Sequence, residues 1–252
     1  TLSSSSAASD VYKRQVLRIF EEVAGGRLTP TYLRIGGVSK DLPEGIEEKI
    51  KEFIQTFPDH IKEYETLLTK NVIWLKRTKE VGIISKEDAI NFGVTGPTLR
   101  GSGVKWDIRK AFPYSSYEEF DFDIPIGSIG DVYDRYIVRL REMEWSNAIV
   151  EQALERLPKG PVVTNDSRIT LPPKDNVLND IASLIRQFKI VSEGFQPPEG
   201  EVYASVEASK GELGFYIVSD GSSRPFRMRI RPPSFLNPVS YTHLRAHETG
   251  RN

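Results

Sequence analysis

The chain has 252 residues, and its 34 Lys and Arg against 35 Asp and Glu give a formal net charge of -1. This balance favours neither nucleic acid nor an acidic membrane surface as a partner. Because there is no cysteine, disulfides, thiolate metal sites, thiol nucleophiles and cysteine-held iron–sulfur clusters are excluded within these residues. Hydrophobic residues make up 38 % and charged residues 27 %, the balance of a globular chain with a real core.

The two ends show neither a helical nor a strand period. Residues 1–15 and 239–252 resemble translated adapter DNA, so we interpret both stretches as foreign to the protein. His243 and His247 stand four apart, a spacing that could bind zinc from one helix face. Since they lie in the foreign tail, we expect no metal site. The expected domain is residues 16–238.

The first part of that domain is predicted to be helical apart from one glycine turn. Residues 16–25 are typical of the end of a helix. The paired glycines of Arg34–Val38 then indicate a turn or a close backbone approach. Apolar residues three or four apart from Ile46 to Leu68 predict a long amphipathic helix, with a kink or a restart after Pro58.

The middle of the chain combines a short capped helix, a glycine-rich segment and a long helix. Ser85 followed by Asp88 resembles a capping box. Gly93–Tyr114 holds four glycines and two prolines and predicts a long ordered loop. Asp131 begins the clearest helix, which is expected to end at Pro158. Its predicted buried face consists of Tyr133, Tyr136, Ile137, Leu140, Met143, Val150, Leu154 and Leu157.

The last elements are one helix and a small sheet. Val177–Val191 is predicted to be a single helix with inward apolar residues, namely Leu178, Ile181, Leu184, Ile185 and Phe188. Alternation then predicts a hairpin of Glu201–Ala208 and Glu212–Ser219 and a further strand at Phe226–Ile230. We therefore expect a helix-rich α+β fold, in which a helical bundle at 16–195 is followed by a small antiparallel sheet at 200–232.

Few residues point to chemistry by themselves. Gly101-Ser102-Gly103 lacks the spacing of a nucleotide-binding loop, and no catalytic triad, carboxylate pair or metal cluster stands out. Four arginines occur within eight positions at Arg224, Arg227, Arg229 and Arg231. They form either a solvated strand face or a surface for an acidic partner or a redox centre.

Four long collinear segments resemble one family. They are Arg34–Val38, Gly93–Tyr114, Gly130–Gln152 and Ser192–Phe235. Together they resemble the quinone-site D subunit of bacterial NADH–quinone oxidoreductase, respiratory complex I, and the resemblance covers essentially all of residues 16–238. It implies a fold similar to the large subunit of nickel–iron hydrogenases, without the metal.

The resemblance also implies a place in a proton-pumping complex. The family lies peripherally on the cytoplasmic side of the bacterial inner membrane, against a small iron–sulfur subunit and an adjoining membrane subunit. Electrons from NADH pass through clusters in other subunits to quinone, which is reduced in a cavity beside the terminal cluster. This chain is expected to hold no cofactor, to bind neither NADH nor nucleic acid, and to be inactive alone.

The family's quinone-headgroup histidine and tyrosine lie in an N-terminal part that is not in this chain, so no catalytic residue is assigned. Three segments are predicted to face the cluster-bearing subunit: Arg34–Val38, Arg100–Gly103 and Asp220–Arg231. The quinone-side or cluster-side candidates are Arg34, Gly36, Gly37, Arg100, Gly101, Gly103, Asp220, Arg224, Arg227, Arg229 and Arg231.

Three alternatives remain open. A homologous dehydrogenase could take electrons from ferredoxin or another donor. A membrane-bound nickel–iron hydrogenase would hold its metal with CxxC pairs near chain ends that are absent here. A non-catalytic binding module would fold stably as a monomer.

Overall fold

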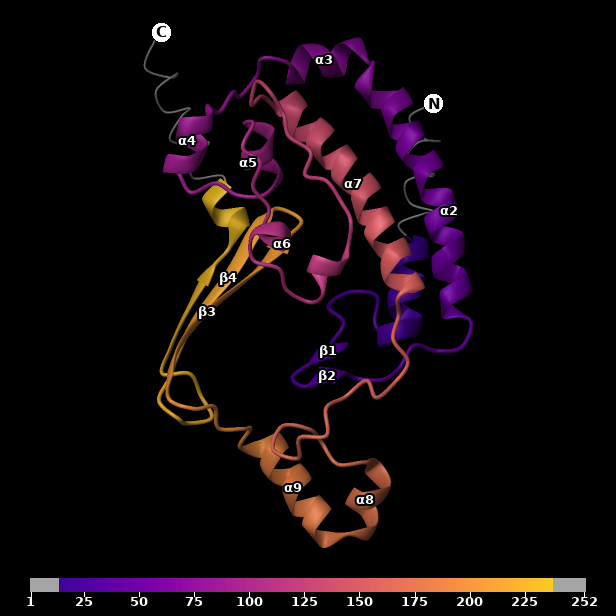
Figure 1. Ribbon diagram of the computed structural model, residues 1–252, viewed down its shortest axis with the longest axis vertical. Helices are drawn as coiled ribbons and strands as arrows, with labels where there is room; N and C mark the ends of the chain where they lie inside the picture. The colour runs from indigo at the N-terminus through magenta and orange to yellow at the C-terminus, as the bar shows by residue number, and fades with distance from the viewer. Residues whose placement is uncertain (1–13, 238–252) are drawn as a thin grey trace. The chain divides into compact units, whose positions relative to one another are not determined.

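A computed structural model of the chain describes residues 14–237 (Figure 1). Residues 14 and 15, which we assigned to the foreign N-terminal stretch, begin a helix that runs to residue 24. The remainder of that stretch, and residues 239–252 with His243 and His247, lie outside the described residues.

Backbone contacts divide the chain into two compact units, each assembled from separate segments. Unit 1 contains the described residues up to Gln55, Arg156–Glu201 and Val218–Arg227. Unit 2 contains Thr56–Glu155, Val202–Ile217 and the described residues from Met228 onward. The expected helical and β regions describe the order of secondary structure, whereas the compact units combine segments from both regions.

The long amphipathic helix α2 (Ile46–Tyr64) confirms the predicted stripe. Ile46, Ile54 and Ile61 are buried at spacings of eight and seven, which return to the same helix face. The helix continues through Pro58 into the π-helix η1 (Glu65–Thr69), so a restart at Asp59 is wrong. The buried isoleucines before and after the proline hold both turns in place, although the ring removes one backbone hydrogen bond.

After the end of α2, unit 2 continues with short helices, of which the first, second and fourth are capped by polar side chains. They are α3 (Val72–Thr78), α4 (Lys86–Asn91), α5 (Pro97–Gly101), α6 (Ile108–Ala111) and the 3-10 turn η2 (Tyr117–Glu119). The expected cap is confirmed, because the Asp88 N–H donates to Ser85 Oγ at 3.0 Å. Gly93–Tyr114 is less loop-like than predicted, since α5 begins with Pro97 at its first turn and Asp107 caps α6.

The long helix α7 (Val132–Glu155) is buried on more than one side. Val138 and Leu140 are both buried, and two residues apart on a helix they point in nearly opposite directions. The predicted single stripe is therefore wrong in part: Val150 is 44 % and Leu157 47 % exposed. A one-stripe pattern describes a helix packed on one side, whereas α7 packs against both α3 and α5.

The core of unit 2 lies beside α4 and α5. Ile84, Ala89, Val94 and Leu99 form a buried apolar cluster, with Val104 packed against it. Residues 97–102 are all buried. The glycine-rich segment therefore crosses the interior of the unit, where its backbone needs internal hydrogen-bond partners.

The predicted helix Val177–Val191 is two helices. Asp180 adopts an extended conformation between α8 (Lys174–Asn179) and α9 (Ile181–Ser192), and its carboxylate accepts from the Ser183 N–H at 2.9 Å. An aspartate that caps a new helix stops the preceding one. The expectation that the apolar residues point inward is also wrong, since the exposed residues include Leu178 at 71 %, Ile181 at 76 %, Leu184 at 49 %, Ile185 at 51 % and Phe188 at 65 %.

The small sheet has the order β3–β4–β5. Its strands are β3 (Gly200–Ala208), β4 (Gly211–Ser219) and β5 (Arg227–Arg231). Each strand begins and ends within one residue of the predicted boundary. A separate pair, β1 (Leu33–Arg34) and β2 (Gly37–Val38), places Leu33 opposite Val38. The helix-rich α+β fold with a small antiparallel sheet is confirmed.

Candidate functional site

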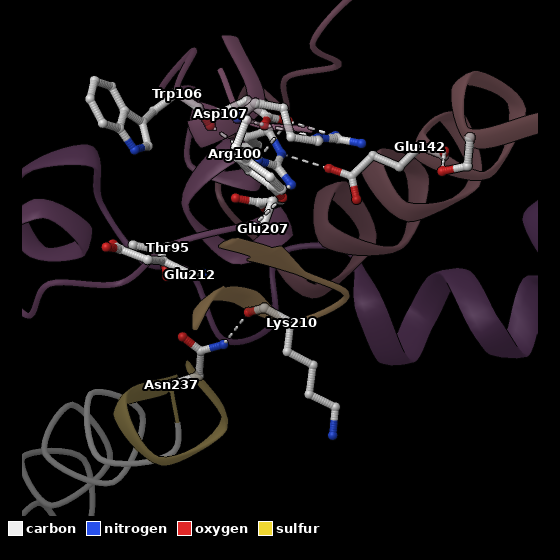
Figure 2. Close-up of polar contacts among 12 residues, drawn as sticks. Thr95, Arg100, Trp106, Asp107, Glu142, Glu207, Lys210, Glu212 and Asn237 are labelled. Carbon is white, nitrogen blue, oxygen red and sulfur yellow. Dashed lines mark hydrogen bonds and ion pairs between the residues drawn. The ribbon is translucent and has the colours of Figure 1, made fainter. Parts of the chain in front are cut away.

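Arg100 is the centre of a buried group of ion pairs in unit 2 (Figure 2). Its Nε donates to Glu142 of α7 at 2.6 Å, and its Nη2 donates to Glu207 of β3 at 2.9 Å. Its Nη1 donates to the Trp106 carbonyl at 3.1 Å and to Asp107 at 3.4 Å. One guanidinium in α5, only 2 % exposed, therefore joins α6, α7 and the hairpin. A planar group with five N–H donors is suited to this role.

Arg109 completes this group, which we call the Arg100 cluster: Arg100, Asp107, Arg109, Glu142 and Glu207. Burial by itself would raise the pKa of Asp107, but the bonds from Arg109 at 3.0 and 2.7 Å and the charge of Arg100 lower it. Burial raises the pKa of Glu207, and the charge of Asp107 adds to that rise against the opposing effect of Arg100. The two carboxyls are thus biased in opposite directions.

A second contact attaches the β3–β4 hairpin to the segment before α5. The Glu212 N–H donates to Thr95 Oγ1 at 3.0 Å, and Arg231 pairs with the Glu212 carboxylate at 3.2 Å. Gly96 has a φ of 70°, and a Cβ there would clash with the backbone of Gly211. Both glycines are needed because the two backbones approach so closely.

The start of α7 is held by two aspartates. Asp131, 1 % exposed, accepts from the Asp134 N–H at 2.7 Å and from the Glu80 N–H at 2.8 Å. Asp134 accepts three backbone N–H bonds from Ser128–Gly130, at 2.6 to 3.1 Å. Burial would raise the pKa of Asp134, but these bonds lower it. Asp131 thus caps the helix that the sequence predicts to begin there.

The glycine turn of Arg34–Val38 lies in unit 1 and makes the predicted close approach. The Thr164 N–H donates to the Gly36 carbonyl at 2.8 Å, and Gly37 bridges to Val163. A Cβ at Gly36 would lie 2.8 Å from the Thr164 methyl. Arg34 is exposed at the rim of a largely apolar cleft. The residues that line this cleft include Leu33, Ile35, Ile169, Leu171, Ile190 and Phe195.

The arginine-rich segment is mostly exposed. Arg224, Arg227 and Arg229 are exposed, whereas Arg231 is held by Glu212. The apolar face of β5 is also accessible, with Met228 52 % exposed. Asp220 accepts from the Ser222 N–H at 3.0 Å in the turn before this strand.

The predicted candidates are divided between the two units. Unit 1 holds Arg34, Gly36, Gly37, Asp220, Arg224 and Arg227, and unit 2 holds Arg100, Gly101, Gly103, Arg229 and Arg231. Within unit 2, Arg100 lies in the interior, and a Cβ at Gly101 would lie 2.7 Å from Arg135 Cγ. Whether these residues face a cluster-bearing partner stays a prediction.

Sequence reasoning missed the partners of Arg100. Asp107 had a usable signal, because an aspartate before a short polar helix is a typical cap. Glu142 and Glu207 had none, since one lies in a helix rich in charge and the other in an alternating strand. Their pairing joins positions separated by 42 and 107 residues from Arg100.

Comparison with known sequences then decides the family. The profile described as "Respiratory-chain NADH dehydrogenase, 49 Kd subunit" matches residues 10–249. The chain belongs to this family. The Gly93–Tyr114 segment, buried at residues 94–102, and the start of α7 thus belong to a chain of the 49 kDa subunit family.

Curated relatives carry a more specific name. The chain is 57 % identical over 225 residues to the NADH-quinone oxidoreductase D subunit of Geotalea uraniireducens, which covers 89 % of this chain and 58 % of that protein. It is 54 % identical to the D subunit of Geobacter sulfurreducens, with the same coverage. One such protein of Chloroflexus aurantiacus, its D subunit 2, is 48 % identical over 235 residues, 92 % of this chain and 57 % of that protein. The chain thus spans somewhat more than half the length of these relatives.

Residues 14–237 contain neither a candidate membrane span nor a candidate metal site. No helix there is long and apolar enough to cross a bilayer. No group of three or more His, Asp or Glu side chains there is arranged to hold a metal ion. Because the sequence has no cysteine, these residues also lack thiolate ligands for an iron–sulfur cluster.

Proposed function

We propose that this chain acts as part of the D subunit in an H⁺-translocating NADH–quinone oxidoreductase. The observation that carries the proposal is the match over residues 10–249, joined by 57 % identity to a protein of that name. In the complex, the chain helps to form the quinone-reduction cavity beside the terminal iron–sulfur cluster of a neighbouring subunit. Electrons from NADH reach that cluster through other subunits.

The surfaces of unit 1 support assembly with partners. The apolar face of α9 is exposed, as are Leu33 and Ile35 beside Arg34. Contiguous exposed apolar residues typically mark interaction surfaces. The exposed Arg224 and Arg227 add positive charge, which suits an acidic partner. We assign these surfaces to the small iron–sulfur subunit and the adjoining membrane subunit, on the cytoplasmic side of the membrane.

The residues of unit 2 supply rigidity in this proposal. The Arg100 cluster holds the hairpin to the helices, and the Glu212–Arg231 pair joins β4 to β5, so loops on this framework keep a fixed geometry. The chain holds no cofactor of its own, and quinone binds against it together with the neighbouring subunit. Isolated, the chain is expected neither to oxidise NADH nor to reduce quinone.

A chimera tests the proposal. Residues 16–237 would replace the matching segment of the Geobacter sulfurreducens D subunit in a strain that lacks the native copy. We expect membranes from this strain to assemble the complex and to reduce quinone with NADH. The chimera carrying Arg100→Leu is the matched control, because it should fail to assemble.

Two results would contradict the proposal. A chimeric complex that assembles but reduces no quinone would show that this segment does not support the cavity. A chimeric complex that accepts electrons from reduced ferredoxin but not through the NADH module would show that the chain belongs with another donor.

A further inference from the structure

The Arg100 cluster contains more negative than positive groups in a place that water barely reaches. Three carboxylates, Asp107, Glu142 and Glu207, are joined by ion pairs to two guanidinium groups, Arg100 and Arg109, so these ion-paired groups carry one negative charge in excess when all are ionised. A third guanidinium, Arg139 of α7, also acts on Glu142, but it is exposed to solvent. The side chains of Arg100, Asp107 and Glu207 are only 2 %, 1 % and 6 % exposed. An unbalanced buried charge is costly, and a carboxyl group can remove it by taking up a proton.

Glu207 is the carboxylate best placed to take that proton. Asp107 is bound through both oxygens by Arg109 and also pairs with Arg100. Glu142 receives the shortest bond from Arg100, at 2.6 Å, and is 17 % exposed. Among the described residues, Glu207 has one ion-pair partner, Arg100 at 2.9 Å. Burial and the charge of Asp107 raise its pKa.

Charged and titratable groups from several elements surround Glu207. Arg100 of α5, Asp107 and Arg109 at α6 and Tyr114 after α6 act on Glu207 itself. Glu142 and Arg139 of α7 act on its partner, Arg100. The Glu207 N–H also donates to the Tyr114 hydroxyl at 2.8 Å. The backbone of β3 is therefore fixed at the residue that carries the titrating carboxyl.

We propose that Glu207 binds one proton when the β3–β4 hairpin docks against α5 and α6, so that protons hold the hairpin in place. At the other attachment of the hairpin, the Glu212 N–H donates to Thr95 Oγ1 at 3.0 Å, and the one carboxylate there, Glu212, pairs with one guanidinium, Arg231 of β5. The Arg100 cluster is thus the attachment at which proton binding is expected. This inference does not depend on the proposed function.

The direction of the pH effect follows from the raised pKa. The ordinary pKa of a glutamate in an unfolded chain is about 4.3. The stabilisation from proton binding is complete below that value and is lost as the pH rises through the higher pKa of the folded state. The wild-type hairpin should therefore loosen with rising pH, while a chain with a neutral residue at position 207 should not.

The test compares full-length wild type with Glu207→Gln, using thermal unfolding followed by circular dichroism. We expect the midpoint of Glu207→Gln, measured relative to wild type, to rise by about 2–4 °C between about pH 5 and about pH 8. Glu212→Gln in the same hairpin is the matched control and should show no such rise. A difference between Glu207→Gln and wild type that is constant or falls with pH would overturn the proposal.

A second measurement needs no variant. In the wild-type chain with ¹³C-labelled glutamate, one side-chain carboxyl should titrate at a higher pH than the others. Its resonance should change sharply together with the backbone amides of β3. If every glutamate carboxyl titrates in the ordinary range, the proposal is wrong.

Discussion

Similar sequence patterns lead to different degrees of burial in the two units of this molecule. In unit 2, apolar periodicity ends in a buried cluster, and Arg100 is surrounded by partners from three other elements. In unit 1, the equally clear pattern of α9 leaves Phe188 65 % exposed. An amphipathic pattern therefore predicts that one face of a helix packs against something apolar. It does not predict which chain or segment packs there.

The largest expected difference between the units comes from removing Arg100, the central cation of unit 2. Arg100→Leu leaves three carboxylates without their shared partner, and loss of one member of a buried pair costs about 3–5 kcal/mol. We expect urea unfolding to begin at much lower concentration, with hydrogen exchange rising in α5, α7 and β3.

The control for that change is Arg168→Leu in unit 1. Arg168 pairs with Asp166, but its side chain is 85 % exposed. Exposed pairs contribute little, so the unfolding curve should barely move. Equal losses in the two variants would contradict the distinction between the units.

Truncation of an apolar side chain should cost more stability in unit 2 than in unit 1. Ile84→Ala opens a cavity in the core of unit 2, for which about 2–5 kcal/mol is expected. Leu184→Ala on the exposed face of α9 should change stability by less than about 0.5 kcal/mol. Segment-resolved hydrogen exchange by mass spectrometry measures both. A large loss at Leu184 would show that α9 is already covered within this chain.

Two glycines with similar φ angles give a finer test. Gly96 in unit 2 has a φ of 70° and faces the backbone of Gly211, whereas Gly25 in unit 1 has a φ of 79° and open space around it. Both Ala variants carry backbone strain of about 1 kcal/mol or more, but only Gly96→Ala must also displace the hairpin. Thermal melts should therefore show the larger loss for Gly96→Ala, and equal losses would mean that the hairpin is not packed there.

The smallest expected effect is on the stability of the fold at acidic pH. Burial by itself would raise the pKa of Asp134, but hydrogen bonds from the backbone N–H groups of Ser128–Gly130 lower this pKa in the folded state. Its stabilisation is therefore present above the unfolded value of about 3.9 and is lost as the pH falls toward the lower folded pKa. Asp134→Asn should flatten the acid side of the stability profile. An unchanged profile in acid titrations would show that these hydrogen bonds do not bias the carboxyl.

Local signals predicted much of this fold. The stripe of α2, the Ser85 cap and the β3–β4 hairpin depend on neighbours within a few residues, and each was found where the sequence placed it. The break at Asp180 also had a local signal, because aspartate favours caps, yet apolar periodicity on both sides concealed it.

Other features could not be predicted because they depend on distant residues. Nothing near Glu207 indicates a buried partner, since its ion pair is made with Arg100 of another element. The burial of α7 depends on α3 and α5, which pack against it and lie earlier in the chain. The predicted glycines of Arg34–Val38 and Arg100–Gly103 were recognisable because a strained or crowded backbone restricts residue type directly.

The distance in sequence between Arg100 and Glu207 also has a consequence for synthesis. A ribosome must add 107 residues after Arg100 before its β3 partner exists. During that interval, Asp107 and Glu142 are already available, whereas the strand that completes unit 2 is not. Because long-range contacts form late and leave apolar surface uncovered, the nascent chain should depend on chaperones until the hairpin emerges.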